Sequence, residues 1–82
     1  MIMQLTQTEN LIMQWYFQFN NKIGAIMSAS QYNNFRANIE DEKIVKDLKS
    51  AVCSLIDKGY LKLDSRNNFA LTSKGFNYIN NK

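Results

Sequence analysis

From Glu40 to Asp64 the chain reads EDEKIVKDLKSAVCSLIDKGYLKLD, and the period of its hydrophobic residues changes inside this stretch. In the first part, apolar side chains recur every three or four residues, which is typical of an amphipathic helix. These side chains are Ile44, Leu48, Ala51, Val52, Leu55 and Ile56. Acidic residues open the segment, where the helix dipole favours negative charge, and Gly59 closes it. The stretch therefore predicts a helix over residues 40–58.

After this helix the hydrophobic period becomes two, which is typical of a strand. In residues 60–64, YLKLD, the two leucines face one way and the lysine faces the other. Residues 65–68, SRNN, favour a turn, because Asn tolerates a positive φ and Ser bonds to neighbouring backbone. Residues 69–72, FALT, alternate again. The pattern predicts a β-hairpin, followed by a short helix that Thr72 or Ser73 caps.

Upstream, Thr6-Gln7-Thr8-Glu9 has the spacing of a capping box and predicts a helix over residues 7–19. This helix is apolar around most of its circumference, which favours burial on more than one side. A chain of 82 residues offers little surface for that burial, so we expect a homodimer. The expected dimer interface comprises Leu11, Ile12, Trp15, Tyr16, Phe19, Tyr78 and Ile79. A ligand pocket among the aromatic residues of this helix is the alternative interpretation.

Residues 22–39 carry a weaker signal. Their apolar residues fit one helical face and are Ile23, Ile26, Met27, Tyr32 and Phe35. We expect one helix within residues 24–36, with Ser28 or Ser30 as the cap of a shorter one. Residues 1–82 thus form one domain, mainly α with a small β-hairpin (α+β).

The composition limits the chemistry of this domain. The chain has no histidine, one cysteine and a net charge of +3. An imidazole base, a histidine-containing zinc site and an internal disulfide are therefore excluded. We expect a cytoplasmic binding protein rather than an enzyme, with no catalytic residues, no cofactor, no metal, no membrane span and no targeting segment in residues 1–5. Cys53 is expected to be a buried small residue rather than a redox sensor, because no basic residue adjoins it in sequence.

Two junctions resemble those of a known class of regulators. Leu55-Ile56-Asp57-Lys58-Gly59-Tyr60-Leu61 is similar to the point where the recognition helix ends and the wing begins in MarR- and PadR-type regulators. Leu71-Thr72-Ser73-Lys74-Gly75 resembles the sequence that closes the wing in the same families. With the order of elements, these junctions imply a winged helix-turn-helix domain with three helices, a two-stranded wing and a short C-terminal helix. They also imply a small transcriptional repressor that binds double-stranded DNA as a homodimer.

The resemblance implies that the helix over residues 40–58 and the wing over residues 60–72 contact DNA. The candidate DNA-binding residues on or beside these elements are Arg36, Lys43, Lys46, Lys49, Ser50, Lys62, Arg66, Asn67 and Asn68. Basic side chains bind phosphates, and Ser and Asn hydrogen-bond to phosphates or base edges. The opposing interpretation is a solvated helix face whose lysines pair with Glu42 and Asp47.

The distribution of charge departs from that class of regulators. Ile39-Glu40-Asp41-Glu42-Lys43 places three carboxylates where phosphates would lie. Residues 40–58 hold four lysines and five acids, whereas residues 59–82 hold four basic residues and one acid. This departure supports a second hypothesis, a winged-helix protein-interaction module without strong DNA binding, such as a mobile-element inhibitor or an adaptor of a host, replication or partition protein. A partition or replication adaptor that does bind DNA is a third.

Overall fold

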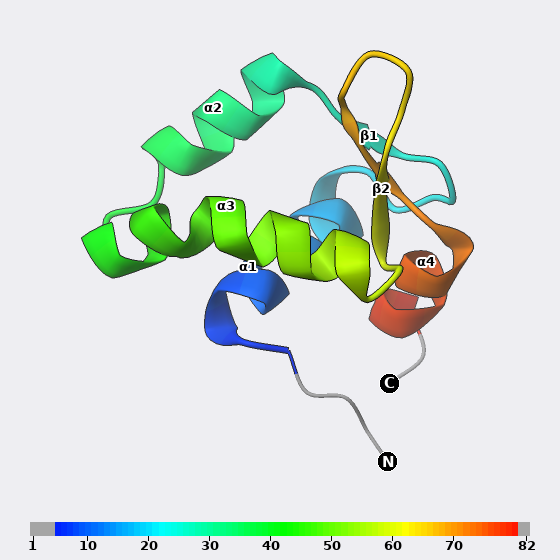
Figure 1. The fold of residues 1–82 in the computed structure, drawn as a ribbon, viewed down its shortest axis with the longest axis horizontal. Helices are drawn as coiled ribbons and strands as arrows, with labels where there is room; N and C mark the ends of the chain where they lie inside the picture. The colour runs from blue at the N-terminus through cyan, green and yellow to red at the C-terminus, as the bar shows by residue number, and fades with distance from the viewer. Residues whose placement is uncertain (1–4, 81–82) are drawn as a thin grey trace.

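The computed structural model describes residues 5–80, and these form four helices and a three-stranded antiparallel sheet (Figure 1). The helices are α1 (Gln7–Phe19), α2 (Ala29–Ala37), α3 (Glu42–Asp57) and α4 (Ser73–Asn80). The strands are β1 (Ile26–Met27), β2 (Leu61–Leu63) and β3 (Phe69–Leu71). The mainly helical α+β class is thus confirmed. Residues 1–4, which include most of the segment relevant to a targeting signal, lie outside the described residues, as does Lys82.

Capping boxes begin both of the first two helices. At α1, the Thr6 side chain accepts from the Glu9 backbone at 3.2 Å, and the Thr6 backbone donates to the Glu9 carboxylate at 2.8 Å. At α2, Ser28 and Gln31 make the same reciprocal pair at 3.2 and 2.9 Å. Ser28 is therefore the N-cap, and α2 begins at Ala29, inside the range of residues 24–36 that the sequence predicts for this helix.

Strand β1 corrects the sequence interpretation of residues 26–27, whose side chains had been assigned to a helical face. Gly24 has a φ of 83°, which turns the chain after α1, and Ile26 and Met27 then pair with Ala70 and Phe69 of β3. The order of strands in the sheet is β1-β3-β2. A two-residue strand has too little sequence to show a period, and its partner lies more than forty residues away.

The predicted hairpin is confirmed, with Leu61 opposite Leu71 and Leu63 opposite Phe69. In its turn, Asn67 has a φ of 62°, a conformation that Asn tolerates better than most residues. The sequence pattern places Leu61 and Leu63 on one face, but only Leu61 is buried, whereas Leu63 is 50% exposed.

The hydrophobic core lies between α1, α3, α4 and the sheet (Figure 1). Its main side chains are Ile12, Met13, Tyr16, Met27, Leu48, Ala51, Val52, Leu55, Leu61, Leu71 and Ile79. Tyr16 is completely buried, and its hydroxyl donates to the Phe69 carbonyl at 2.6 Å, which ties α1 to β3. Burial raises the pKa of the Tyr16 hydroxyl well above its usual value.

Three residues of the expected dimer interface belong to this core instead. Ile12, Tyr16 and Ile79 are 1%, 0% and 4% exposed within the single chain, so they have no surface left to offer a partner. The apolar circumference of α1 is satisfied in part by α3 on one side and α4 on another. The prediction of those three as interface residues is therefore wrong.

Glycines allow the wing junctions to close tightly. Gly59 has a φ of 85° and ends α3, as the sequence predicts. The backbone nitrogen of Gly75 donates to the Thr72 hydroxyl at 3.0 Å, so Thr72 is the cap of α4. A Cβ at Gly75 would collide with the Tyr60 carbonyl oxygen and lie 2.8 Å from Leu71 Cδ1. Only a residue without a side chain lets α4 lie this close to the start of the wing.

A buried ion pair joins α1 to α3. Glu9 is 1% exposed, and the Lys58 ammonium donates to its two carboxylate oxygens at 2.8 and 3.1 Å. Burial raises the pKa of the Glu9 carboxyl, but hydrogen bonds from Lys58, Ser54 and Thr6 outweigh it, and the pKa falls from 4.5 to about 2. The carboxylate is therefore ionised throughout the neutral range.

Helix α2 is the least embedded element and has no buried residue. Its Tyr32 ring packs edge-on against the Phe69 ring, with 5.5 Å between the centroids. Residues 38–41 then join α2 to α3 in a short turn. The position of α2 is thus set by this turn and by a few half-buried side chains.

Candidate nucleic-acid interface

The surface of α3 opposite its buried stripe contains a shallow hollow. The hollow is lined by Lys46, Lys49, Ser50, Cys53, Ser54 and Asp57. It therefore brings together three of the predicted DNA-binding residues, Lys46, Lys49 and Ser50. We call this surface, together with Lys62 and Arg66 of the hairpin, the α3–hairpin face.

Cys53 is exposed in this hollow, so the expectation that it is buried is wrong. The buried residues of α3 are Leu48, Ala51, Val52 and Leu55. A step of one residue turns a helix by about 100°. Cys53 therefore leaves the buried stripe although its neighbour Val52 belongs to it.

Lys43 lies outside the hollow that Lys46 and Lys49 share, although Lys46 also borders the hollow of Lys43. Lys43 lines a different hollow, beside the start of α1, with Asp41 and Asp47 among its neighbours. Asp41 is the N-cap of α3, and its side chain accepts from the Lys43 backbone at 2.9 Å. A carboxylate of the protein itself thus occupies the helix terminus, where a phosphate would otherwise find free amides.

Within residues 5–80, the lysines of α3 form no ion pair with an acid of the same helix. Among residues 5–80 the structure shows one ion pair, between Lys58 and Glu9. The pairing with Glu42 and Asp47 that a solvated helix face predicts is therefore not formed.

The hairpin tip is held by Asp64. Its carboxylate accepts from the backbone nitrogens of Arg66 and Asn68 at 2.8 and 2.9 Å. Hydrogen bonds from Asn68 and Arg66 hold the pKa of the Asp64 carboxyl below its usual value. The Asn68 amide also donates to Asp64 at 3.4 Å, so Asn68 shapes the turn, whereas the side chains of Arg66 and Asn67 are exposed.

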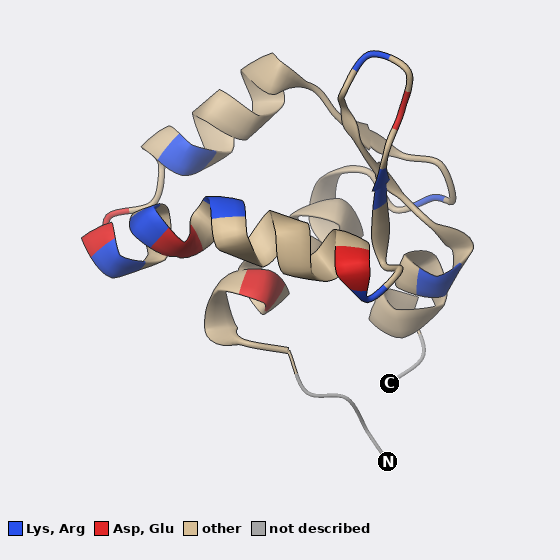
Figure 2. Cartoon of the chain, viewed as in Figure 1, with Lys and Arg blue, Asp and Glu red and all other residues tan. Residues whose placement is uncertain are grey.

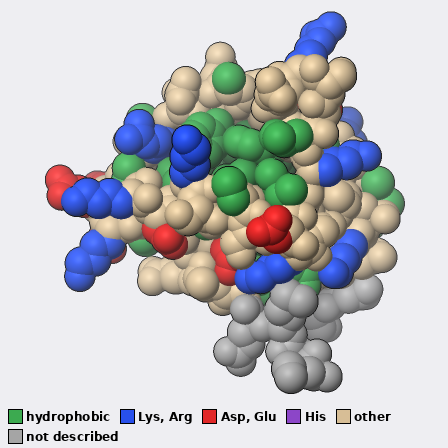
Figure 3. All heavy atoms as spheres, in the orientation of Figure 1, with side chains coloured by type: hydrophobic (Ala, Val, Ile, Leu, Met, Phe, Trp, Pro, Cys, Tyr) green, Lys and Arg blue, Asp and Glu red, His purple; other side chains and the backbone are tan. Residues whose placement is uncertain are grey.

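Basic residues lie along both edges of the α3–hairpin face. Figure 2 shows Lys and Arg on α2, on the first half of α3, on β2 and at the hairpin tip. These residues include Arg36, Lys62 and Arg66, and all three are exposed. Figure 3 shows basic side chains at either flank of this side of the molecule and hydrophobic side chains gathered between them.

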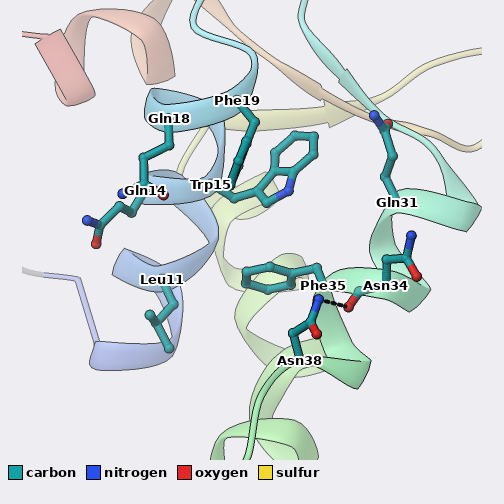
Figure 4. A pocket seen from close by; sticks show the side chains of 9 residues that line it. All are labelled: Leu11, Gln14, Trp15, Gln18, Phe19, Gln31, Asn34, Phe35 and Asn38. Atoms are coloured by element: carbon teal, nitrogen blue, oxygen red, sulfur yellow. Dashed lines mark hydrogen bonds between the residues drawn. The ribbon is translucent and has the colours of Figure 1, made fainter.

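A further concavity, the α1–α2 groove, has a volume of about 610 Å³ (Figure 4). Helix α1 contributes Leu11, Trp15 and Phe19, and α2 contributes Phe35. The remaining lining residues are Gln14, Gln18, Gln31, Asn34 and Asn38. None of the nine side chains carries a charge. Three residues of the expected dimer interface, Leu11, Trp15 and Phe19, therefore meet in this groove.

Tyr78, the last expected interface residue, lies elsewhere. Its ring packs against Tyr60 with 5.0 Å between centroids, and its hydroxyl donates to Asn10 at 3.4 Å. It lines a separate hollow between α1 and α4. The structure thus does not bring Tyr78 to the groove.

The hydrophobic pattern of the sequence does not indicate that α2 contributes to the groove. Its lining residues are mostly amides, which show no hydrophobic period. A signal does exist, because residues 10–35 hold one charged residue, Lys22. Depletion of charge over so long a segment marks a surface that is not simply solvated.

Within residues 5–80, no group of three or more Cys, Asp or Glu side chains is placed to hold a metal ion. None of the helices in the same part of the chain combines the length and apolar character required to cross a membrane. Comparison with protein-family models, with curated proteins and with solved structures finds no match for this chain.

Proposed function

We propose that the chain is a winged helix-turn-helix protein that binds duplex DNA through the α3–hairpin face. Helices α2 and α3 are joined by the four residues 38–41, a connection of the length that helix-turn-helix motifs use. A hairpin follows α3 directly and projects beside it (Figure 1). In this assignment α3 is the recognition helix and the hairpin is the wing.

One observation carries the proposal: exposed basic residues of α3 and of the hairpin border the same side of the molecule (Figure 3). Helix α3 has 16 residues and is about 24 Å long. A helix can enter the major groove, where Lys46, Lys49 and Ser50 would meet phosphates and base edges. Arg66 at the wing tip would then meet the neighbouring backbone or minor groove.

The acidic start of α3 decides where DNA contacts are made. Asp41 already caps the helix, so phosphates bind to lysines further along α3 and to the wing rather than to the helix terminus. Few phosphates are neutralised by such a face, and binding is therefore modest and sensitive to salt. A dimeric repressor of this kind would bind two half-sites about one helical turn, roughly 34–36 Å, apart.

The test is fluorescence anisotropy with duplex DNA at low salt, beginning with the DNA that flanks the coding sequence. Lys46→Ala and Arg66→Ala should each weaken binding and reduce the salt slope by about 1. Lys22→Ala removes the same charge from the loop before β1 and is the matched control; its affinity should stay close to that of the wild type. Absence of duplex binding, or equal affinities for all four proteins, overturns the proposal.

A second candidate function is docking of another protein on the same face. The hydrophobic side chains between the basic flanks in Figure 3 favour it, because duplex DNA presents little apolar surface. On α2, α3 and β3, half-buried hydrophobic residues include Tyr32, Ile56 and Phe69. A protein partner predicts a stable complex in pull-down that Leu63→Ser weakens, and no duplex affinity at about 100 mM salt.

A further inference from the structure

The exposed surface of α1 carries no charge. Its one charged residue, Glu9, is buried, and residues 10–21 contain no Asp, Glu, Lys or Arg. Figure 2 shows the rest of α1, and α2 up to its last turn, without coloured charges. Solvent-facing surfaces normally hold about 25–35% charged residues, whereas the centres of protein interfaces are depleted of them. This side of the molecule has the composition of an interface.

The same surface contains both a projecting ring and a hollow. Phe19 is 71% exposed at the end of α1, and it borders the α1–α2 groove of about 610 Å³. Figure 4 shows Trp15 in the middle of the groove, with Phe19 beside it on α1 and Phe35 opposite it on α2. A projection and a hollow within one patch allow the self-complementarity that a two-fold contact requires, because each copy can then fill the other.

We propose that the α1–α2 groove is the dimerisation surface and that its occupant is a second copy of this chain, with Phe19 of each copy seated in the groove of the other. The chemistry of the rim favours a copy over a different protein. Gln14, Gln18 and Asn34 are primary amides, and each carries both donors and an acceptor, so an amide can pair with the same amide across a two-fold axis. The surface also brings no like charges together, although the chain has a net charge of +3.

The oligomeric state tests this proposal without DNA, so its failure is separate from failure of the proposed function. Sedimentation velocity or light scattering over a concentration series should show a monomer–dimer equilibrium. Phe19→Glu should abolish the dimer, because two charges would be buried against apolar surface. Ile23→Glu is the matched control at a residue that is 59% exposed and outside the groove, and it should leave the dimer intact.

A second variant keeps the test independent of Phe19. Gln14→Lys changes an exposed residue on the groove wall, so folding should be unaffected, and dimerisation should weaken at least about tenfold. A protein that is monomeric at every concentration overturns the proposal, as does a dimer that neither variant affects. The chain has one tryptophan, Trp15, so its fluorescence reports on the groove directly. A monomer whose Trp15 emission responds to small planar aromatic compounds would show a ligand site instead, and would likewise overturn the proposal.

Discussion

The ammonium group of Lys58, which follows the last residue of α3, donates to both carboxylate oxygens of Glu9 in the first turn of α1. The two residues are 49 positions apart in sequence. Oxygen Oε1 of Glu9 also accepts from the backbone of Thr6, so one carboxylate caps its own helix and binds the end of another. The side chain of Glu9 is 2% exposed and that of Lys58 is 24% exposed. Water can therefore reach the ammonium group but not the carboxylate, whose charge needs the ion pair for compensation.

Lys58→Ala should therefore destabilise the protein strongly. It leaves an ionised carboxylate buried with only its hydrogen bonds, and breaking such a pair costs about 3 kcal/mol. Urea denaturation measures the change in the free energy of unfolding. Lys62→Ala removes an exposed lysine that forms no ion pair among residues 5–80, and it should change stability by less than about 0.5 kcal/mol. Equal losses in the two variants would contradict this role of the pair.

The same carboxylate predicts how stability depends on pH. The fold lowers the pKa of the Glu9 carboxyl from its ordinary value of 4.5 to about 2. Because the folded pKa is lowered, the stabilisation is complete above pH 4.5 and is lost as the pH falls towards 2. The shift corresponds to about 3 kcal/mol.

Urea midpoints measured between neutral pH and pH 2 should show this loss. Glu9→Gln should be less stable at neutral pH and should show a shallower decline over the acidic range. Asp64, whose pKa is also lowered, adds to the decline in both proteins. Parallel curves for the wild type and Glu9→Gln would show that Glu9 is not the group responsible.

Two glycines should respond to alanine for different reasons. Gly75→Ala places a Cβ against the Tyr60 carbonyl and Leu71, and overpacking of this kind costs about 1–3 kcal/mol or more. Gly24→Ala meets no atom within 4 Å, but its φ of 83° is unfavourable for alanine by about 1–2 kcal/mol. Thermal unfolding should show the larger loss for Gly75→Ala, together with altered packing of α4 in the near-ultraviolet spectrum of Tyr60 and Tyr78. A harmless Gly75→Ala would contradict the close approach of α4.

Cys53 provides a probe of the proposed DNA contact. It is the one cysteine of the chain and is exposed in the hollow beside Lys49 and Ser50. A bulky maleimide should react with the native protein, and the adduct should weaken duplex binding by at least about tenfold, or 1.4 kcal/mol. Cys53→Ser treated with the same reagent is the control for unspecific damage. An adduct with unchanged duplex affinity would move DNA away from this hollow.

Local signals in the sequence predicted most of the fold. The capping box at Thr6, the stop at Gly59 and the change of period after it depend on neighbouring residues, and all three are confirmed. Strand β1 was missed because Ile26 and Met27 are a strand only through β3, which lies far along the chain. The Glu9–Lys58 pair was missed for the same reason, since no local pattern connects the ends of two helices.

The candidate sites were predicted less well than the fold. A helical period tells which residues share a face, so Lys46, Lys49 and Ser50 do meet in one hollow. It does not tell which face a neighbouring helix covers, and Ile12 and Tyr16 were therefore assigned to a dimer although α3 and the sheet bury them. Exposure depends on packing between elements, which a single segment does not encode.

Helix α2 lies between the two proposed surfaces and contributes residues to both. It has no buried residue of its own that fixes it to the core. Asn34 and Phe35 line the groove, whereas Arg36 on the same helix borders the α3–hairpin face. With both proposed contacts formed, a second copy and a duplex would each restrict the motion of one weakly held helix. Their binding free energies are then coupled reciprocally: DNA tightens the dimer by the same factor by which dimerisation tightens DNA. Occupancy of the DNA would consequently rise more steeply with the concentration of the protein than either equilibrium alone allows.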